Sequence, residues 1–296
     1  MVRLEHVSKS FAAIKAVDNV SLDVKKAAIT ILTGADGAGK STIFKMLVGL
    51  VKKDSGAILL NGEDIGSDYS RITSICGFMP ERFSLYTDLS VEENLNFFAA
   101  VQQVPLPRRE ELKKRLLERT GMSPFRKRRA GALSGGMKQK LALSTILLSS
   151  PELIILDEPT TGVDPLSRIE FFAIIEALKN EGKTIVMSTP YLDEAEKGDN
   201  IIFIKNGRVM RQDSISGLRD SFPARLFRIL PRDNIFEVMA HISAIPGLVG
   251  QVHIRGKFIR YMQIGSENLG RQIPHLEMVE EKPTLEDMYI YYERQQ

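Results

Sequence analysis

The segment Gly34–Thr42 constrains the fold of this chain more than any other part of its sequence. It reads Gly-Ala-Asp-Gly-Ala-Gly-Lys-Ser-Thr and fits the pattern G-x-x-x-x-G-K-[ST]. It directly follows Ala28–Thr33, a run of apolar and β-branched residues that predicts a buried strand. Its last three residues begin the segment Lys40–Val51, which predicts a helix. The pattern requires a strand before it and a helix after it. The segment therefore predicts a phosphate-binding loop within an α/β fold.

The residue types explain how such a loop would bind. Glycines let consecutive backbone N–H groups turn toward a phosphate, and a helix N-terminus adds a favourable dipole. Lys40 would contact the β- and γ-phosphates, and the Ser41 hydroxyl would bind Mg²⁺. The expected phosphate-binding residues are Gly34, Ala35, Asp36, Gly37, Ala38, Gly39, Lys40, Ser41 and Thr42. The alternative is a glycine-rich turn without a ligand.

A pair of acidic residues follows a second buried strand, predicted over Leu153–Leu156. Asp157 would hold Mg²⁺ through water, and Glu158 would act as the catalytic base that takes a proton from the attacking water. Taken alone, two acidic residues at this place are more simply a solvated strand end. Together with the phosphate loop, they predict a site that hydrolyses a nucleoside triphosphate.

Two regions of different pattern divide the chain. Up to about residue 215, short β-branched runs alternate with helical segments, which is typical of a parallel α/β sheet. Residues 216–296 instead predict a small α+β accessory domain, with strands over 225–230, 248–254 and 258–264 and helices over 233–245 and 284–294. A length of 296 residues fits one large domain and one smaller one.

Composition excludes several other classes of protein. The chain has 40 Lys and Arg against 37 Asp and Glu, so its net charge of +3 does not indicate a nucleic-acid-binding protein. Its single cysteine, Cys76, forms no internal disulfide, and no histidines stand at metal-binding spacing. No apolar run approaches the ~20 residues that cross a bilayer, and no secretory signal is visible. We therefore expect a soluble chain on the cytosolic side.

The segment Leu133–Lys140 indicates a family. It reads Leu-Ser-Gly-Gly-Met-Lys-Gln-Lys and resembles the L-S-G-G-x signature of ABC-type ATPases. Three more segments that resemble the family follow in the expected order: Asp157–Thr160, Thr161–Pro165 and Tyr191–Glu196. The resemblance covers residues 1–215. More loosely, Pro283–Tyr289 resembles the C-terminal extension of ATPases from ABC-2-type exporters, and three stretches resemble the first, degenerate half of tandem exporter ATPases: Pro124–Arg126, Leu133–Lys140 and Thr160–Arg168.

The resemblance implies a phosphate-loop ATPase core over residues 1–215 with a mixed or parallel sheet, and a helical signature subdomain over about 82–140. It also implies ATP and Mg²⁺ as cofactors. In such proteins two ATP-binding domains pack head to tail, so that the signature of one faces the γ-phosphate held by the other. Here the signature comprises Leu133, Ser134, Gly135, Gly136 and Met137, and Asp164 lies in the interface loop. Phe11 and Val17 stand where the family contacts adenine, although Phe11 could instead be a core residue.

Two positions depart from the family pattern. Glu81 ends the stretch Gly77–Glu81, where the family has a glutamine that contacts Mg²⁺. A carboxylate there could still bind Mg²⁺ but would repel the γ-phosphate. Pro190 stands where the family has its switch histidine, and proline has no side-chain donor and no N–H. These departures predict an ATP site that binds well but turns over slowly, unless a nearby group replaces the histidine.

The surface of the helical subdomain carries a basic cluster, Arg126–Arg129, which is either a solvated face or a docking site beside a membrane partner. The resemblance also implies a groove at Phe83, Leu85 and Tyr86 that receives a permease helix. We expect an ATPase subunit that powers an ABC exporter, with a second ATP-binding domain (in a homodimer or an unequal pair) and permease subunits as partners, no nucleic acid, and a peripheral cytoplasmic location. The alternatives are a regulatory half with little hydrolysis and a soluble ABC ATPase unconnected with transport.

Overall fold

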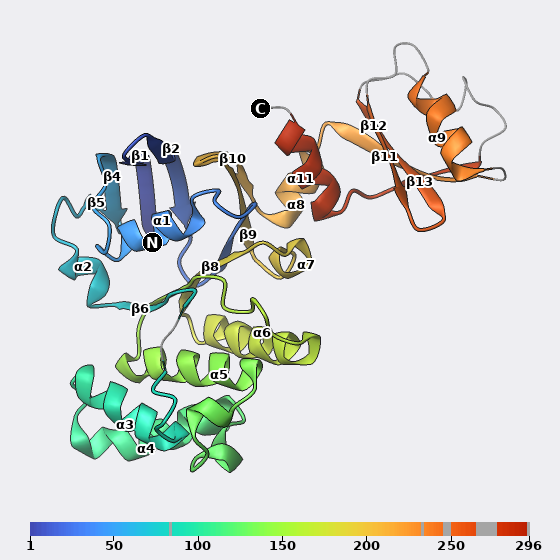
Figure 1. Ribbon diagram of the computed structural model, residues 1–296. Helices are drawn as coiled ribbons and strands as arrows, with labels where there is room; N and C mark the ends of the chain where they lie inside the picture. The colour runs from blue at the N-terminus through green and yellow to red at the C-terminus, as the bar shows by residue number, and fades with distance from the viewer. Residues whose placement is uncertain (83–84, 232–233, 245–249, 265–276, 295–296) are drawn as a thin grey trace. The chain divides into compact units, whose positions relative to one another are not determined.

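The computed structural model describes residues 1–82, 85–231, 234–244, 250–264 and 277–294 (Figure 1). The chain divides into two compact units, Met1–Ile215 and Ser216–Gln296. None of the helices in these described ranges combines the length and the apolar character needed to span a membrane.

An antiparallel sheet begins the first unit. Its strands are β1 (Val2–Phe11), β2 (Ile14–Val24), β4 (Ser55–Leu60) and β5 (Glu63–Asp64), in the order β2-β1-β4-β5. Buried residues alternate with exposed ones in the first half of β1, where Val2 and Leu4 point into the core. This alternation is typical of a strand with one face covered by protein.

A second, mostly parallel sheet carries the strands predicted from the apolar runs. Its order is β10-β9-β3-β8-β7-β6, and only β10 pairs antiparallel. The bounds are β3 (Ile29–Thr33), β6 (Cys76–Met79), β7 (Leu153–Leu156), β8 (Thr184–Thr189), β9 (Asn200–Lys205) and β10 (Arg208–Asp213). Every residue of β3, β7 and β8 is buried, because helices or the other sheet cover both faces. The predicted α/β fold with a mixed sheet is confirmed.

Helix α1 (Lys40–Leu47) links the two sheets. Its residues Ile43, Phe44, Met46 and Leu47 share one hydrophobic core with buried residues of β1, β2 and β4 and of β3, β7, β8 and β9. The helix is shorter than predicted, because Gly49 adopts a φ of +74° just beyond its end and stops the helical backbone. The remaining helices around the parallel sheet are α2 (Ser70–Thr73), α6 (Pro165–Asn180) and α7 (Leu192–Ala195).

Residues 85–149 are mainly helical and lie at the lower left of Figure 1. The elements are α3 (Val91–Val101), α4 (Leu106–Arg119), η1 (Ser123–Phe125), η2 (Ala130–Ala132), α5 (Gly135–Ile146) and η3 (Leu147–Ser149). The Lys113 ammonium is buried between α3 and α4, where it donates to Asn96 Oδ1 and pairs with Glu92 and Glu110. Arg126 donates to both of these carboxylates. Part of the predicted basic cluster is therefore a structural ion network.

The second unit is a four-stranded antiparallel sheet with helices. Its elements are α8 (Ile215–Asp220, which starts at the last residue of the first unit), β11 (Ala224–Leu230), α9 (Ile235–Ser243), β12 (Gly250–Arg255), β13 (Phe258–Ile264), β14 (Glu277–Glu281) and α11 (Leu285–Arg294). The order β12-β13-β11-β14 places β13 between β11 and β12, so β11, α9 and β12 form a split β-α-β motif. Of the predicted bounds, Asp233, Ile245 and Leu248 lie outside the described residues.

Both faces of this sheet are covered. Ile229, Ile259 and Tyr261 pack against α9, whereas Leu226 and Met262 pack with Tyr291 of α11. On the α11 face, Arg260 donates from Nη1 to both carboxylate oxygens of Asp287, at 3.1 and 3.0 Å. Asp287 also accepts from the Thr284 N–H at 2.8 Å. Asp287 thus caps the predicted helix start at Thr284 and forms a buried ion pair with Arg260.

Candidate functional site

The backbone of Gly34–Thr42 needs glycine at two places for steric reasons. Gly39 has a φ of +104°, and a Cβ there would lie 2.4 Å from the Ala16 carbonyl oxygen. A Cβ on Gly34 would lie 2.1 Å from the carbonyl oxygen of Ile204. Neither clash can be relieved by a side-chain movement, because both partners are backbone atoms. The loop is therefore held tightly between β2 and the end of β9.

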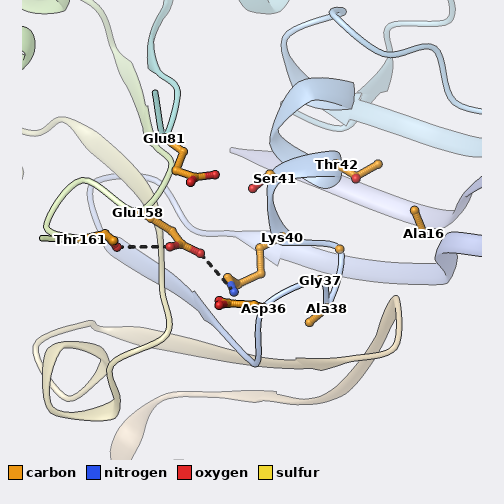
Figure 2. Close-up of a pocket in the computed structure, with 11 residues that line it drawn as sticks. Ala16, Asp36, Gly37, Ala38, Lys40, Ser41, Thr42, Glu81, Glu158 and Thr161 are labelled. Carbon is orange, nitrogen blue, oxygen red and sulfur yellow. Dashed lines mark hydrogen bonds and ion pairs between the residues drawn. The ribbon is translucent and has the colours of Figure 1, made fainter. Parts of the chain in front are cut away.

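Lys40 begins α1 and points its ammonium back into this loop. Nζ donates to the Gly34 carbonyl oxygen at 2.8 Å and to that of Ala35 at 3.1 Å, and it lies 3.3 Å from Glu158 Oε1. Lys40 is only 4% exposed. A buried ammonium is costly without a counter-charge, and here the Glu158 carboxylate supplies it (Figure 2).

Asp157 follows β7 and is 1% exposed. Its Oδ1 accepts from the Ser41 hydroxyl at 3.1 Å and from the Ser188 hydroxyl at 2.7 Å. The Ser188 hydroxyl also accepts from the backbone N–H of Glu158 at 2.9 Å. Ser188 is a site residue that the sequence analysis missed. The signal that could have found it is its position as the last residue of Thr184–Ser188, a second apolar run that pairs in parallel with Leu153–Leu156.

Glu158 has an unusual backbone. Its φ is +49°, a left-handed conformation that non-glycine residues rarely adopt. Its Oε2 accepts from the Thr161 hydroxyl at 3.2 Å, so its second oxygen is held while the first faces Lys40. A strained residue persists only where the surrounding structure holds it in place. Thr161 is a second residue that the sequence analysis missed.

These side chains surround a cavity of about 440 Å³, at the edge where the carboxyl ends of β3, β6 and β7 meet. In open α/β sheets this edge is the usual place for a ligand. Glu81, which follows β6, extends toward Ser41 in the same cavity (Figure 2). The lining residues are Ala16, Asp36, Gly37, Ala38, Gly39, Lys40, Ser41, Thr42, Glu81, Glu158 and Thr161.

The oxygen atoms at this edge suit Mg²⁺. Ser41 offers a hydroxyl, and Asp157 and Glu81 offer carboxylates, the hard ligands that this cation prefers. Within the described parts of the chain, no cluster of three or more His, Cys, Asp or Glu side chains could hold a metal ion by itself. Mg²⁺ is usually bound by one or two carboxylates together with substrate phosphates.

The two residues expected at adenine differ in placement. Phe11 ends β1 and is 46% exposed, and the Lys9 ammonium lies 5.4 Å from its ring centre. Val17 is fully buried in the core, because it points inward from β2. The Val17 side chain does not line the cavity, and its contact with adenine stays a prediction. Its neighbour Ala16 lines the cavity instead.

The signature residues lie on another surface, and none of them is among the residues that line the cavity of the same chain. Ser134 caps α5 by accepting from the Met137 N–H at 3.3 Å, and both Ser134 and Gly135 are exposed. Leu133 is buried. A Cβ on Gly136 would lie 2.4 Å from Ser167, so this glycine allows α5 to pack against α6. The packing of α5 against α6 therefore also explains why position 136 is a glycine.

Asp164 and Pro190 flank the site. Asp164 caps α6 by accepting from the Ser167 N–H at 2.9 Å, and this hydrogen bond lowers the pKa of its exposed carboxyl. Pro190 directly follows β8, at the same sheet edge as the cavity, but it is not among the lining residues. Its half-buried ring offers no hydrogen-bond donor.

Comparison with known proteins identifies the family. Residues 17–161 match the family model described as ABC transporter. Over 98% of its length the chain is 35% identical to the "Probable multidrug ABC transporter ATP-binding protein YbhF" of Escherichia coli (strain K12), and it spans 51% of that protein, about half its length. It is 36% identical to the "Lantibiotic transport ATP-binding protein SrtF" of Streptococcus pyogenes, over 73% of this chain and 92% of that protein.

Solved structures agree with this result. The dimeric structure of MJ0796, a bacterial ABC transporter cassette, superposes with a TM-score of 0.66 and 26% sequence identity, covering 73% of this chain and 99% of that one. The same cassette is known as a dimer in a post-hydrolysis state bound to ADP and Pi, with the same score. With its phosphate loop, acidic pair and signature in place, this chain belongs to the ATP-binding proteins of ABC transporters.

Proposed function

We propose that the chain binds ATP with Mg²⁺ in the described cavity and hydrolyses it to power an ABC-type exporter. The observation that carries the proposal is the meeting of Lys40, Ser41, Asp157 and Glu158 at one edge of the parallel sheet, although these residues come from two distant segments. They supply a cation for the phosphates, oxygen ligands for Mg²⁺ and a carboxylate base.

Each residue has a definite role in this proposal. The loop N–H groups of Gly34–Thr42 and the Lys40 ammonium bind the phosphates. Ser41 and Asp157 hold Mg²⁺, which when bound neutralises charge on the β- and γ-phosphates. Glu158 accepts a proton from the attacking water. Because the Glu158 carboxylate pairs with the Lys40 ammonium, the triphosphate must displace this carboxylate before it can face the attacking water.

We propose that a second ATP-binding domain completes the site. Ser134 and Gly135 are exposed at the start of α5, away from the cavity of their own chain, so their N–H groups can face a phosphate held by another domain. Asp164 is exposed at the start of α6 and would join the same interface. The dimeric MJ0796 cassette supports this arrangement.

We propose permease subunits in the membrane as the other partners, which would place the chain on the cytoplasmic face of the membrane. The names of YbhF and SrtF, a probable multidrug transporter protein and a lantibiotic transport protein, support an exporter. A second cavity, of about 430 Å³ and lined by Glu81, Arg82, Leu85, Thr87, Ala130, Gly135, Lys138, Gln139 and Ala142, is the proposed seat of a permease segment. Tyr86 is 47% exposed beside it, whereas Phe83 lies outside the described residues.

We propose slow turnover at this site, with the chain as one half of an unequal pair. Glu81 places a carboxylate beside the metal position, and Pro190 places no donor at the sheet edge where the family has histidine. The same two residues favour the second candidate function, a regulatory half that binds ATP with little hydrolysis. We also propose that residues 1–215 are the ATP-binding domain, with the helical part at about 82–140, and that 216–296 are an accessory domain.

Binding and single-turnover hydrolysis of ATP separate these functions. The wild-type chain should bind ATP with Mg²⁺ and hydrolyse it slowly, and Lys40→Ala should lose binding. The matched control is Lys45→Ala, which removes a lysine from the exposed side of the same helix. Binding without any hydrolysis, with and without a partner domain, would favour the regulatory half. Absence of ATP binding would contradict both functions.

A further inference from the structure

The carboxylate of Glu194 is an unexplained buried charge near the site. Glu194 lies on α7 and is 1% exposed. A buried carboxylate is costly unless hydrogen bonds and a counter-charge compensate it. If this position served only for packing, an apolar residue would stabilise the fold more than a buried carboxylate does. The partners of the carboxylate therefore indicate its role.

One oxygen of Glu194 joins two loops at the edge of the sheet. Oε2 accepts from the Thr160 hydroxyl at 2.8 Å and from the Thr189 hydroxyl at 2.5 Å. Thr160 stands two residues after Glu158, and Thr189 directly precedes Pro190. Both threonines are buried, so water cannot easily replace these hydrogen bonds.

The other oxygen faces an arginine. Among the described residues, Oε1 is a buried atom with no hydrogen-bond partner, and Arg168 Nη1 lies 3.8 Å from it. The same guanidinium donates from Nε to the Val163 carbonyl oxygen at 3.0 Å and lies over the Tyr191 ring at 4.6 Å. Arg168 therefore connects Glu194 to the interface loop that ends at Asp164.

These contacts hold the strained backbone of Glu158 from both sides. On one side, the Ser188 hydroxyl accepts from the Glu158 N–H and donates to Asp157. On the other side, Thr160 is tied to Glu194. A residue with a φ of +49° keeps this conformation only where the surrounding structure holds it there. If Thr160 were released, Glu158 could relax and its carboxylate would move.

We propose that Glu194 is a positioning residue for Glu158, and that Arg168 is the cation that compensates its buried charge. The inference rests on the proposed function, because it assigns Glu194 a part in ATP hydrolysis. Glu194 does not contact the nucleotide. It fixes Thr160, so that when phosphates displace Glu158 from Lys40, only the Glu158 side chain moves. Pro190 does not restrain Glu158 in this way, because it has no hydrogen-bond donor.

The test compares Glu194→Gln with wild type by single-turnover hydrolysis and by the affinity for ATP with Mg²⁺. Glu194→Gln should lower the hydrolysis rate about 10- to 100-fold, since small misplacements of a reacting group have effects of this size. Its ATP affinity should not fall, because Glu194 does not contact the nucleotide. Asp193→Asn is the matched control: it removes an exposed carboxylate from the same helix and should leave both quantities unchanged.

Thr160 provides a second, milder pair of variants. Thr160→Val removes the hydroxyl and should slow hydrolysis as Glu194→Gln does, whereas Thr160→Ser keeps it and should retain the wild-type rate. Combining Thr160→Val with Glu194→Gln should cost less than the sum of the two single losses, because both variants weaken the same hydrogen bond: the first removes its donor, and the second replaces its charged acceptor by a neutral amide oxygen. Amide hydrogen exchange of the ATP-bound chain should increase in residues 158–164 in Glu194→Gln and stay unchanged in β8.

Three results would overturn the inference: a wild-type hydrolysis rate in Glu194→Gln, an equal loss of ATP affinity and rate, or fully additive effects of the two variants. The second would show that Glu194 only stabilises the fold. Failure of the proposed function has a different signature, because then the wild-type chain would itself show no ATP binding or no hydrolysis.

Discussion

The Lys40 ammonium lies 3.3 Å from Oε1 of Glu158, and both side chains are largely shielded from solvent. The proposed base therefore occupies the position of an anion at the phosphate loop. ATP has to replace this ion pair with its own phosphates. We therefore expect the ion pair to lower the affinity for nucleotide, and its opening to release the base when substrate binds.

Replacing Glu158 by glutamine should therefore raise the affinity for ATP. The variant keeps the shape of the side chain but leaves the Lys40 charge to the phosphates alone. We expect about tenfold tighter binding, or about 1.4 kcal/mol, with hydrolysis abolished. Isothermal titration calorimetry with ATP and Mg²⁺ measures this directly. Unchanged or weaker binding would show that Glu158 does not compete with the nucleotide.

Introducing histidine at position 190 should speed up hydrolysis. Pro190 follows β8 at the edge that holds the cavity, so we expect an imidazole there to reach the attacking water or the γ-phosphate. A positioned proton-transfer group contributes on the order of 10²- to 10⁴-fold, and we expect Pro190→His to regain part of this in single-turnover assays. Pro190→Ala, which removes the ring but adds no donor, is the control. An equal gain in both variants would show that the proline ring itself, not the lack of a donor, limits the rate.

The ion network of the helical subdomain should weaken in acid. The hydrogen bond from Arg126 is the main cause that lowers the pKa of Glu92 below its ordinary value of 4.5. A lowered pKa stabilises the fold above pH 4.5, and this contribution is lost as the pH falls through the folded-state value. The melting temperature of wild type should therefore fall more between pH 7 and about pH 3.5 than that of Glu92→Gln.

Glu111→Gln is the control for this experiment, because Glu111 is an exposed carboxylate on α4 outside the network. It should keep the acid sensitivity of wild type. Equal pH profiles for wild type and Glu92→Gln would mean that the network does not contribute to stability.

The buried pair Arg260 and Asp287 should be essential to the second unit. Removing Asp287 takes away the carboxylate that accepts from Nη1 of the buried Arg260 and leaves Glu281, which accepts from Nη2 at 3.0 Å, as its remaining partner. Breaking a buried ion pair in this way typically costs about 3–5 kcal/mol. In urea unfolding, followed by signals from residues 216–296, we expect Asp287→Ala to lower the free energy of unfolding by this amount. Replacing both residues with apolar ones, Arg260→Met with Asp287→Leu, should recover most of it. A single variant as stable as wild type would show that α11 does not depend on the pair.

The sequence predicted the parts of this protein that depend on local pattern. Apolar runs such as Leu153–Leu156 are strands buried on both faces, and the glycines of the loop are required by backbone contacts at Gly34 and Gly39. Ala16 rather than Val17 lines the cavity, for a local reason. Ala16 and Val17 are neighbours on a strand, so their side chains point to opposite faces. A shift of one residue along the strand therefore replaces a cavity-lining residue with a core residue.

The supporting residues could not be predicted in the same way. Ser188, Thr161 and Glu194 act through contacts with the loop after β7, and two of them lie at least 30 positions from their partners. No spacing pattern joins such residues, because the fold alone brings them together. Gly136 shows a related limit: its family position indicates a phosphate contact, while the close approach of Ser167 is visible only in the structure.

The central claim is that ATP joins the loop Gly34–Thr42 of one domain to the signature of another, and the molar mass of Glu158→Gln in solution tests it most directly. Light scattering after gel filtration should show a monomer without nucleotide and a dimer with ATP and Mg²⁺. Adding Gly135→Asp should abolish the dimer but not ATP binding, since it places a negative charge at the exposed signature facing the phosphate. A monomer at saturating ATP, or a dimer that forms equally well with Asp at position 135, would contradict the account.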